Sequence, residues 1–370
     1  MAAGSTTGNL FRITTWGESH GKAIGVVVDG CPAGLSLCEE DIQVFLDRRK
    51  PGQSKFTTQR KEEDMVEILS GVFEGKTTGT PISMMIRNKD QRSKDYGNIA
   101  EMYRPGHADY TFDEKFGFRD YRGGGRSSAR ETAARVAAGA VAIKVLNELG
   151  IDVFAYTKSI GNVVCQDAAF DRDYIKENHL SMPDRDAVTK AEAYLSEMME
   201  KQDSSGGIVE CQIHGMPVGI GEPVFDKLSA RLAGAISSIG AVKGFEIGEG
   251  FQASTMNGSV NNDCFYYDVD GIIRKETNHA GGILGGMSDG SPIVIRAAFK
   301  PTPSIGSVQR TVNKSGENVE TVIKGRHDPI VVPRAVVVVE AMTAITVLDL
   351  LLTSMTSRMD YVKDFFMSKR

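Results

Sequence analysis

Residues 128–149 read SARETAARVAAGAVAIKVLNEL, an alanine-rich stretch that carries few charges beyond Arg135. Its length and composition predict a long apolar helix, and the hydroxyl of Ser127 or Ser128 can cap the start by accepting a backbone hydrogen bond. A second apolar stretch, at about 333–353, predicts another long helix near the end of the chain. We expect each of these helices to close one half of the chain.

The segments that precede the two helices match in order. Each half begins with a strand and a Gly/Pro turn, continues with a helical pattern, and then shows two more strand patterns with glycine turns. The matched segments are 24–30, 39–49, 68–75 and 79–87 in the first half and 208–213, 226–238, 242–248 and 290–296 in the second. Coincidence of short Gly/Pro turns is the alternative. Counted together with the two closing helices, however, the five ordered matches favour duplication of a strand–helix–strand–strand–helix unit.

The sequence therefore predicts an α/β fold, a single-domain β-α-β sandwich with an internal pseudo-twofold duplication. The half-repeats run roughly from 8 to 150 and from 205 to 355. No low-complexity linker separates them, so all 370 residues are assigned to one domain. Long charged loops are expected around 50–60, 88–125 and 300–330, and loops of such length in a compact protein are usually functional or mobile.

The composition is that of a soluble globular protein, with 41% hydrophobic and 25% charged residues. The formal net charge of −5 argues against a nucleic-acid partner, because an acidic surface repels the phosphate backbone. The basic residues are nevertheless clustered, since six lie between Arg48 and Lys61 with no acidic residue among them. Such a cluster in an acidic chain predicts a site for a small polyanion.

Cysteine usage and hydropathy predict a soluble, cytoplasmic protein. Five cysteines are an odd number without a C-x-x-C pair, so we expect reduced, buried thiols. No secretory signal is expected, because the N-terminal segment lacks a basic region followed by an apolar run. The most apolar window, 335–353, contains Glu340 and Asp349, which indicates a buried helix and no membrane span.

The segment 119–135, RDYRGGGRSSARETAAR, predicts an anion site. Three glycines let the backbone turn tightly, and five arginines surround them: Arg119, Arg122, Arg126, Arg130 and Arg135. Free N–H groups and the helix dipole favour negative charge at a helix start, and guanidinium groups bind phosphate or carboxylate in pairs of hydrogen bonds. An exposed basic turn is the alternative if this segment is considered alone.

Two motifs suggest other enzyme classes but lack the context those classes require. Gly75-Lys76-Thr77 is similar to the end of a P-loop, yet Ser70 stands where glycine is needed, and a strand is expected to follow. Residues 17–21, GESHG, fit the nucleophile elbow of serine hydrolases, but a strand-like segment follows where a helix is needed. A serine hydrolase with Ser19 as nucleophile, testable by fluorophosphonate labelling, stays a second hypothesis.

The six histidines form no metal-binding pattern, so no metal site is predicted. His20 and His107 lie in turns rich in glycine or proline, among anion-binding loops. They are the candidates for proton transfer near pH 7. Residues 300–304, KPTPS, offer donors for a further phosphate, whereas residues 326–329, RHDP, pair a guanidinium with a carboxylate and could equally be a structural ion pair.

Five motifs in the same order resemble those of the chorismate synthase family: 17–21, 104–109, 125–132, 300–304 and 325–329. The resemblance extends from about residue 8 to about residue 355. Ile330 departs from it, because the family usually has a small residue or cysteine there, and we expect an effect on packing only. Lys55 stands where many members have arginine, which keeps the charge but loses bidentate geometry.

The resemblance implies anti-1,4-elimination of phosphate from 5-enolpyruvylshikimate 3-phosphate to give chorismate, with reduced FMN and no net redox change. The clustered arginines fit this, because substrate and FMN together carry two phosphates and two carboxylates. The resemblance also implies a homotetramer. NADPH is a possible electron source, but no reductase module is evident, which favours an outside supply of reduced FMN. A non-catalytic flavin- or polyphosphate-binding protein is the alternative, and it would not need the histidines.

The resemblance also implies roles by position. His20 would be the acid that assists phosphate departure, His107 would protonate reduced FMN, and Asp328 would manage the proton at flavin N5. The residues that would bind substrate anions are Ser19, Arg49, Lys55, Arg104 and Arg130. Those that would surround FMN are Arg126, Ser127, Ser128, Gly240, Ala241, Gly285, Lys300, Pro301, Thr302, Pro303, Ser304 and Arg326.

Overall fold

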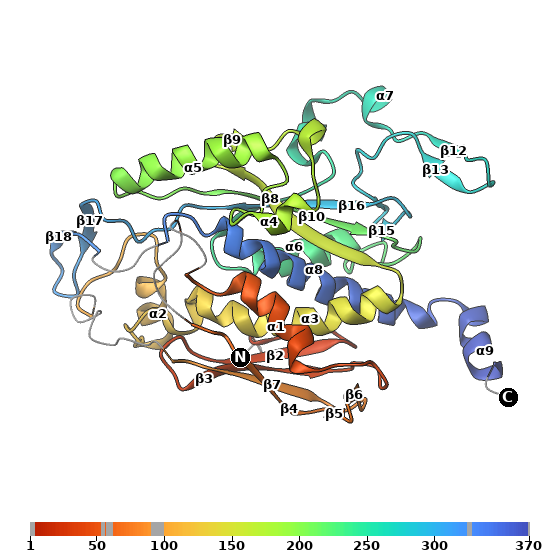
Figure 1. Ribbon diagram of the computed structural model, residues 1–370, viewed down its shortest axis with the longest axis horizontal. Coiled ribbons are helices and arrows are strands. Elements are labelled where there is room, and N and C mark those ends of the chain that lie inside the picture. The colour runs from red at the N-terminus through yellow and green to blue at the C-terminus, as the bar shows by residue number, and fades with distance from the viewer. Residues whose placement is uncertain (1–3, 53–55, 57–61, 90–99, 324–327, 369–370) are drawn as a thin grey trace.

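Two five-stranded antiparallel sheets enclose a layer of helices in the computed structural model of the chain (Figure 1). The structure describes residues 4–52, 56, 62–89, 100–323 and 328–368. One continuous cluster of buried apolar side chains draws on both sheets and on the helices between them. The predicted mixed α/β class is confirmed.

The first sheet is built from the N-terminal part of the chain. Its strands, in spatial order, are β1 (Thr6–Thr7), β2 (Arg12–Gly17), β3 (Ala23–Asp29), β7 (Ile82–Arg87) and β4 (Val66–Ser70). Strand β3 buries Ile24, Val26 and Val28, the alternate residues of its β-branched sequence. A small hairpin of β5 (Val72–Phe73) and β6 (Lys76–Thr77) follows β4.

The second sheet has the strand order β11-β16-β10-β8-β9. Its strands are β11 (Val242–Ile247), β16 (Ile293–Phe299), β10 (Gly207–His214), β8 (Asp152–Ile160) and β9 (Val163–Val164). Strand β10 lies between β8 and β16, as β3 lies between β2 and β7. In each sheet an irregularity interrupts the pairing of the outer strand, β4 on β7 and β11 on β16.

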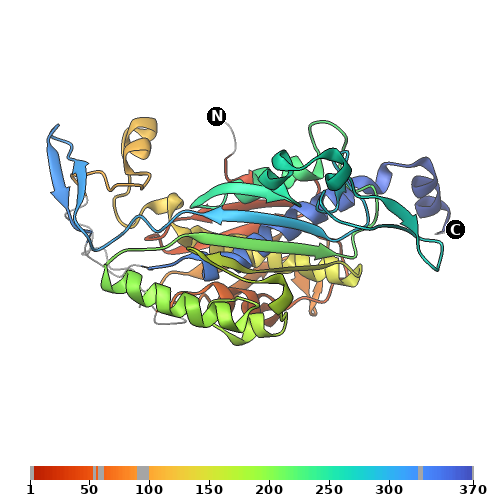
Figure 2. The same ribbon diagram turned by 90° about the horizontal axis from the view of Figure 1, so that it is seen from above.

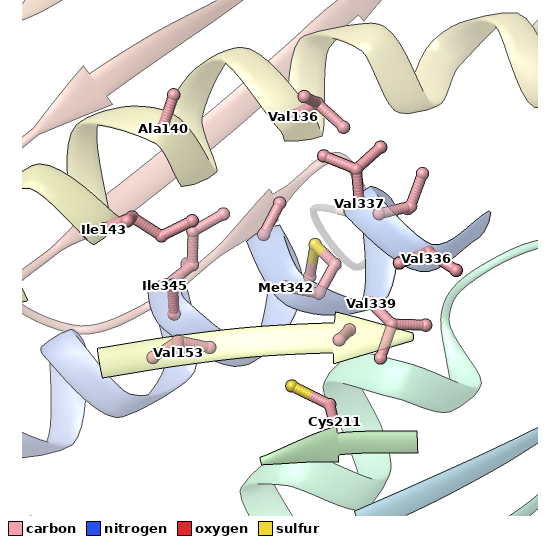
Figure 3. Packing of buried hydrophobic residues seen from close by; sticks show 14 of the residues in the cluster. Val136, Ala140, Ile143, Val153, Cys211, Val336, Val337, Val339, Met342 and Ile345 are labelled. Carbon is pink, nitrogen blue, oxygen red and sulfur yellow. The ribbon is translucent and has the colours of Figure 1, made fainter. Parts of the chain in front are cut away.

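Four helices fill the space between the sheets. They are α1 (Glu39–Arg49), α3 (Thr132–Glu148), α6 (Leu228–Ser237) and α8 (Val332–Thr353). Helix α3 packs on β3 and β7, whereas α8 packs on β8 and β10 and also contacts α3. The close view shows Val136 of α3 beside Val337 of α8, and Ile143 of α3 beside Ile345 of α8 (Figure 3). A Cβ atom at Gly139 would lie 2.2 Å from the Cβ of Ala341, so these helices approach closely because Gly139 has no side chain.

Helix α8 is apolar on every side because protein surrounds it on every side. It meets the length and composition of a membrane span, yet 89% of its most apolar window is buried in the fold, as the sequence predicted. Its two acidic residues are paired. Glu340 accepts hydrogen bonds from Arg48 at 2.7 Å and 2.8 Å, and Asp349 accepts from the backbone N–H groups of residues 9–11.

The start of α3 differs from the prediction. The helix begins at Thr132, and two short 3₁₀ turns precede it, η2 (Gly125–Ser127) and η3 (Ala129–Glu131). Ser128 does act as a cap, but its side chain accepts from the N–H of Arg130 within η3. Ser128 has extended backbone, with φ −71° and ψ 143°, and residues 129–131 form the 3₁₀ turn η3, so the α-helix begins only at Thr132.

The remaining elements lie around the sandwich. They are α2 (Asp109–Phe116), η4 (Asp167–Ala169), α4 (Tyr174–Glu177), α5 (Arg185–Glu200), η5 (Gly250–Thr255), α7 (Gly258–Asn261), β12 (Phe265–Tyr267), β13 (Ile273–Lys275), β14 (Ile283–Leu284), β15 (Met287–Ser288), β17 (Gln309–Val312), β18 (Asn318–Thr321), η6 (Ser354–Thr356) and α9 (Met359–Met367). The hairpin β17–β18 and α2 lie at one end, and the hairpin β12–β13 and α9 lie at the other (Figure 2).

The cysteine prediction holds only in part. All five cysteines are free thiols, and Cys31, Cys165 and Cys211 are buried, but Cys38 and Cys264 are exposed. Cys38 directly precedes α1, and Cys264 directly precedes β12, so both lie at element ends on the surface.

Candidate active site

A cavity of about 730 Å³ lies where the long connections of the two halves meet. Eight lysines and arginines line it against three acidic residues: Arg49, Arg104, Arg126, Arg130, Arg135, Lys243, Lys300 and Arg334 against Glu62, Glu131 and Asp328. His20 and His107 line it as well, so the three predicted proton-transfer residues face one cavity. The predicted gathering of cations is therefore present, and the cavity suits a polyanionic ligand.

Two buried arginines share one carboxylate on the wall of this cavity. Arg49, at the end of α1, places Nη1 2.6 Å from Asp64 Oδ2, and Arg130, in η3, pairs through Nη1 with Asp64 Oδ1. Burial, with the charges of Arg334 and Arg130, lowers the pKa of Arg49 to about 10, although Asp64 acts in the opposite direction. Both guanidinium groups are therefore held in fixed positions.

Arg104 is fixed in a similar way by Asp109 at the start of α2. Its Nε and Nη2 lie 2.8 Å and 2.7 Å from the two carboxylate oxygens, and its backbone N–H also donates to Asp109. Burial would raise the pKa of Asp109, but the hydrogen bonds and charge of Arg104 outweigh burial and lower it. The ion pair stays formed at neutral pH.

His20 lies in the short turn between β2 and β3 and is almost fully buried, with 7% of its surface exposed. Its Nδ1 is 3.1 Å from the hydroxyl of Ser19. A Cβ atom at Gly123 would lie 2.3 Å from Cε1 of the ring. The bare backbone of the glycine turn therefore packs directly against the His20 ring, a contact that sequence reasoning had assigned to a ligand.

His107 has a defined tautomer because of its two partners. Its Nδ1 is 3.0 Å from the carbonyl oxygen of Pro105, which can only accept, so Nδ1 carries the proton. In the neutral ring Nε2 then accepts from the hydroxyl of Ser304, at 3.0 Å. Burial, followed by the charge of Arg104, lowers the pKa of His107 to about 4, so the ring is neutral at pH 7 without a ligand.

The second half of the chain forms the opposite wall. Thr302, Pro303 and Ser304 line the cavity after β16. Lys300 donates to the carbonyl of Gly106 at 2.7 Å, and burial with the nearby Lys243 charge lowers the pKa of Lys300. The hydroxyl of Thr302 is buried without a hydrogen-bond partner among the residues that the structure describes. A ligand in the cavity would supply one.

Gly240 and Ala241 also line the cavity, in the turn that leads into β11. Ala241 has φ +72°, in the left-handed region that costs energy for a residue with a Cβ atom. Its carbonyl oxygen accepts a hydrogen bond from the backbone N–H of Lys300 at 2.9 Å. This bond fixes the turn next to the end of β16 and to residues 300–304, which follow that strand.

Asp328 lies four residues before the start of α8, and its Oδ2 is 2.8 Å from Nη1 of Arg334. Arg334 in turn donates through Nε to the carbonyl of Arg49, at 3.2 Å. Ile330, the residue that departs from the resemblance, is fully buried and forms a bridge with Ser205, so its effect is on packing, as expected.

Three of the other predicted site residues also face the cavity, namely Arg126, Ser127 and Ser128. Ser19 lies beneath His20, and Pro301 lies beside Gly206, so neither lines the cavity. Gly285 lies in the turn between β14 and β15 and does not line this cavity either. Lys55 and Arg326 fall outside the described residues.

Sequence reasoning missed several residues of the cavity. Arg135 bridges Glu131 and Ser238, at 3.0 Å and 2.6 Å, although it belongs to the quoted arginine segment. Arg334 lies in the first turn of α8, where a positive charge is unfavourable because of the helix dipole. An arginine at such a position indicates a functional role, and this could have been recognised from the sequence. Asp64 had no such signal, because its partners come from distant segments.

The two competing motifs do not have the structures that their classes need. Gly21 is followed by β3, so residues 17–21 form a hairpin turn between strands, not a nucleophile elbow. Lys76 and Thr77 form the strand β6, which excludes a P-loop at this position. Both expectations from the sequence are confirmed. Among the described residues, no group of His, Cys, Asp or Glu is arranged to hold a metal ion.

Comparison with known proteins points to one family. The family model described as chorismate synthase matches residues 11–352. A chorismate synthase of Agathobacter rectalis is 66% identical over 98% of this chain and 99% of its own length, and one of Synechocystis is 52% identical over 94% of this chain and 97% of its own. A crystal structure of chorismate synthase superposes with a TM-score of 0.76 at 33% identity, covering 98% of both chains. The chain therefore belongs to the chorismate synthase family.

Proposed function

We propose that the cationic cavity binds 5-enolpyruvylshikimate 3-phosphate together with reduced FMN. As a member of its family the protein is a carbon–oxygen lyase of the shikimate pathway, which eliminates phosphate from this substrate to give chorismate. The observation that carries the proposal is the excess of eight cationic over three acidic side chains around a cavity of about 730 Å³. Cofactor and ligand sites span roughly 300–1,000 Å³.

The residues present fit reduced FMN. The Thr302 hydroxyl, which has no hydrogen-bond partner in the described part of the chain, the strained Ala241 turn and the Lys300 ammonium offer donors and a close backbone approach on one wall. We assign Arg126, Ser127, Ser128, Gly240, Ala241, Lys300, Thr302, Pro303 and Ser304 to holding FMN, whereas Pro301 only shapes the backbone between Lys300 and Thr302. When bound, reduced FMN would lend an electron to the substrate and recover it with the C6 hydrogen, so that no net oxidation would occur.

Three side chains of the chain move protons in this proposal. The His20 ring gives a proton to an oxygen of the leaving phosphate, which makes phosphate a better leaving group. His107 takes up a proton at Nε2 when negative charge enters the cavity, because that charge opposes the burial and the Arg104 field that keep the ring neutral. The ionised Asp328 carboxylate would accept the proton from flavin N5, and Arg334 orients this carboxylate.

The arginines counter the charge of the bound molecules. Arg49, Arg104 and Arg130 would bind the phosphate and carboxylates of the substrate, and each is already held by a buried carboxylate. Because these side chains are ordered before binding, little side-chain entropy is lost when the anions arrive.

Anaerobic phosphate release from 5-enolpyruvylshikimate 3-phosphate, with and without dithionite-reduced FMN, tests the proposal. We expect stoichiometric phosphate and chorismate only with reduced FMN. Tight FMN binding without phosphate release would contradict it and favour a non-catalytic flavin-binding protein. Repeating the assay with FMN and NADPH in place of dithionite tests our further proposal that reduced FMN comes from outside, which predicts no turnover with NADPH alone.

We also propose that the fold arose by pseudo-twofold duplication within a single catalytic domain. The two sheets have corresponding strand orders, the long helices α3 and α8 cross at the centre, and one apolar cluster spans both halves. Folding of residues 1–150 or 205–370 expressed alone, with a cooperative unfolding transition, would contradict the single domain.

Finally, we propose a cytoplasmic homotetramer. The arm around η5, β12 and β13 exposes Phe251, Phe265, Tyr267 and Val269, and α9 buries none of its side chains. Apolar patches of this size are typical of contacts between proteins. Sedimentation equilibrium should give four times the chain mass of 40.1 kDa. A monomer at micromolar concentration would contradict the assembly.

A further inference from the structure

A buried carboxylate lies behind two of the arginines that line the cavity. Asp64 precedes β4, and its side chain has no exposed surface. Both of its oxygens are used, one by Arg49 Nη1 at 2.6 Å and the other by Arg130 Nη1. The arginines line the cavity and Asp64 does not, so the carboxylate supports the wall without forming part of it.

The backbone at Asp64 is adapted to this position. Its φ is +51°, in the left-handed region where most L residues are disfavoured and aspartate is among the better tolerated. The chain thus adopts an uncommon conformation at the residue whose carboxylate reaches both guanidinium groups.

Each guanidinium is also oriented at Nε by a neutral acceptor. Arg49 Nε donates to the hydroxyl of Thr132 at 3.2 Å, and Arg130 Nε donates to Oδ1 of Asn88 at 2.9 Å. Among the residues that the structure describes, the Nη2 groups make only longer contacts, 3.5 Å to the carbonyls of Ala129 and Arg87 and 3.9 Å from Arg130 to Glu62. Nε and Nη1 are therefore satisfied, whereas Nη2 of both arginines retains capacity to donate.

We propose that Asp64 is a positioning residue that ties Arg49 and Arg130 into one receptor for a single anionic group of the substrate. The inference deepens the proposed function and rests on it. Two like charges held this close repel each other, and one shared carboxylate offsets that repulsion while it leaves the pair net positive. The bound group, a carboxylate or a phosphate, would complete the neutralisation from the cavity side.

A double-mutant cycle on kcat/KM tests the inference. We expect Asp64→Asn to lower kcat/KM by about 10²-fold, because a misplacement of about 1 Å can cost that much. Combined with Arg130→Gln, the loss in the double variant should be smaller than the product of the two single losses, because part of the effect of Asp64 passes through Arg130 and the rest through Arg49. Asp64→Asn activity within threefold of the unmodified enzyme, or effects that multiply in the double variant, would overturn the inference.

Glu340→Gln is the matched control. Glu340 is also buried and also pairs with an α1 arginine, Arg48, but neither residue lines the cavity. We expect kcat/KM per folded molecule within threefold of the unmodified enzyme. A loss as large as that of Asp64→Asn would show that any buried carboxylate paired with an α1 arginine is equally necessary, which would refute a specific role for Asp64.

Binding of simple anions gives a readout that does not depend on turnover. Asp64→Asn leaves buried guanidinium charge uncompensated, so its melting temperature should be lower, and an anion that binds the pair should restore it. We expect inorganic phosphate in one arm, or acetate in the other, to raise the melting temperature more in Asp64→Asn than in the unmodified protein. The arm that shows the larger gain identifies the bound group. If neither anion raises the melting temperature of Asp64→Asn more than that of the unmodified protein, the inference is overturned.

The inference can still be tested if Asp64→Asn does not fold or if the unmodified protein shows no activity. If Asp64→Asn does not fold, Asn88→Ala replaces it, because Asn88 is only half-buried and orients the same Arg130. A fall of about tenfold in kcat/KM is then expected from the smaller displacement, and unchanged kinetics would refute the receptor. If the unmodified enzyme releases no phosphate, the proposed function fails, while the anion arms still decide whether Asp64 organises an anion site.

Discussion

The two halves of the molecule share an order of strands and helices but connect equivalent strands differently. In the first half β2 and β3 are joined by residues 18–22, a tight turn that places His20 in the cavity. In the second half the corresponding strands β8 and β10 are joined by residues 161–206, which contain α5 and contribute nothing to the cavity lining. The difference shows that, of two connections at corresponding places in the sheets, only the short one reaches the cavity.

The connections that precede α3 and α8 do not differ in this way, because residues of both line the cavity. The first carries Arg104 and His107, and the second carries Ser304 and Asp328. They meet directly, since Ser304 bonds to the His107 ring. The site thus combines one loop found in only one half with a pair of matched loops, one from each half.

Removal of the His20 imidazole, from the short connection of the first half, should lower activity more than any of the other substitutions. We expect His20→Ala to lower kcat by about 10²–10⁴-fold, the usual scale of general acid catalysis. The matched control is His179→Ala, in the corresponding connection of the second half, where the ring contacts Glu192 at 3.3 Å and stacks on Phe56. It should change kcat less than threefold. Undiminished turnover of His20→Ala with saturating reduced FMN would contradict a catalytic role for the connection 18–22 that the connection 161–206 lacks.

The helix layer allows a second test, on stability. Gly139→Ala should lower the free energy of unfolding by about 1–3 kcal/mol, because the new Cβ would lie 2.2 Å from that of Ala341 and α3 and α8 would have to separate. Gly234→Ala, in α6 of the second half, should raise it by about 0.5–1 kcal/mol, because no atom lies within 4 Å of the new Cβ. Urea unfolding measures both, and shifts of the same sign would contradict the close helix crossing.

The contact between the matched loops should appear in the pH dependence of stability. The folded-state pKa of His107 is about 4, below the value of about 6.5 for an unfolded chain, so the unfolded state binds the proton first. The free energy of unfolding should therefore fall as pH drops from about 6.5 towards 4, by at most about 1.4 kcal/mol per pH unit from this residue. Urea titrations of the ligand-free protein and of His107→Gln should show a smaller slope in the variant. An identical slope would mean that His107 is not buried as described.

Several features could be predicted from residue patterns because local energetics decide them. The bounds of α1 agree with the predicted segment 39–49, and α8 agrees with 333–353 to within a residue, since periodic apolar residues and a proline start are local signals. The left-handed turn at residues 123–125 and the gathering of cations were likewise predictable, because glycine and arginine have few equivalents in those roles.

Contacts between distant segments could not be predicted in this way. The sequence shows that Arg49 and Arg130 are basic, but not that Asp64 holds both, since one partner lies 66 residues away. It marks His107 as a candidate proton carrier, yet the low pKa depends on burial and on Arg104, which are properties of the assembled loops. Residue types and their local spacing thus set the helices, the turns and the charge of the site. The pairing, protonation and orientation of its side chains depend on which surfaces pack together, because burial and long-range contacts exist only in the folded chain.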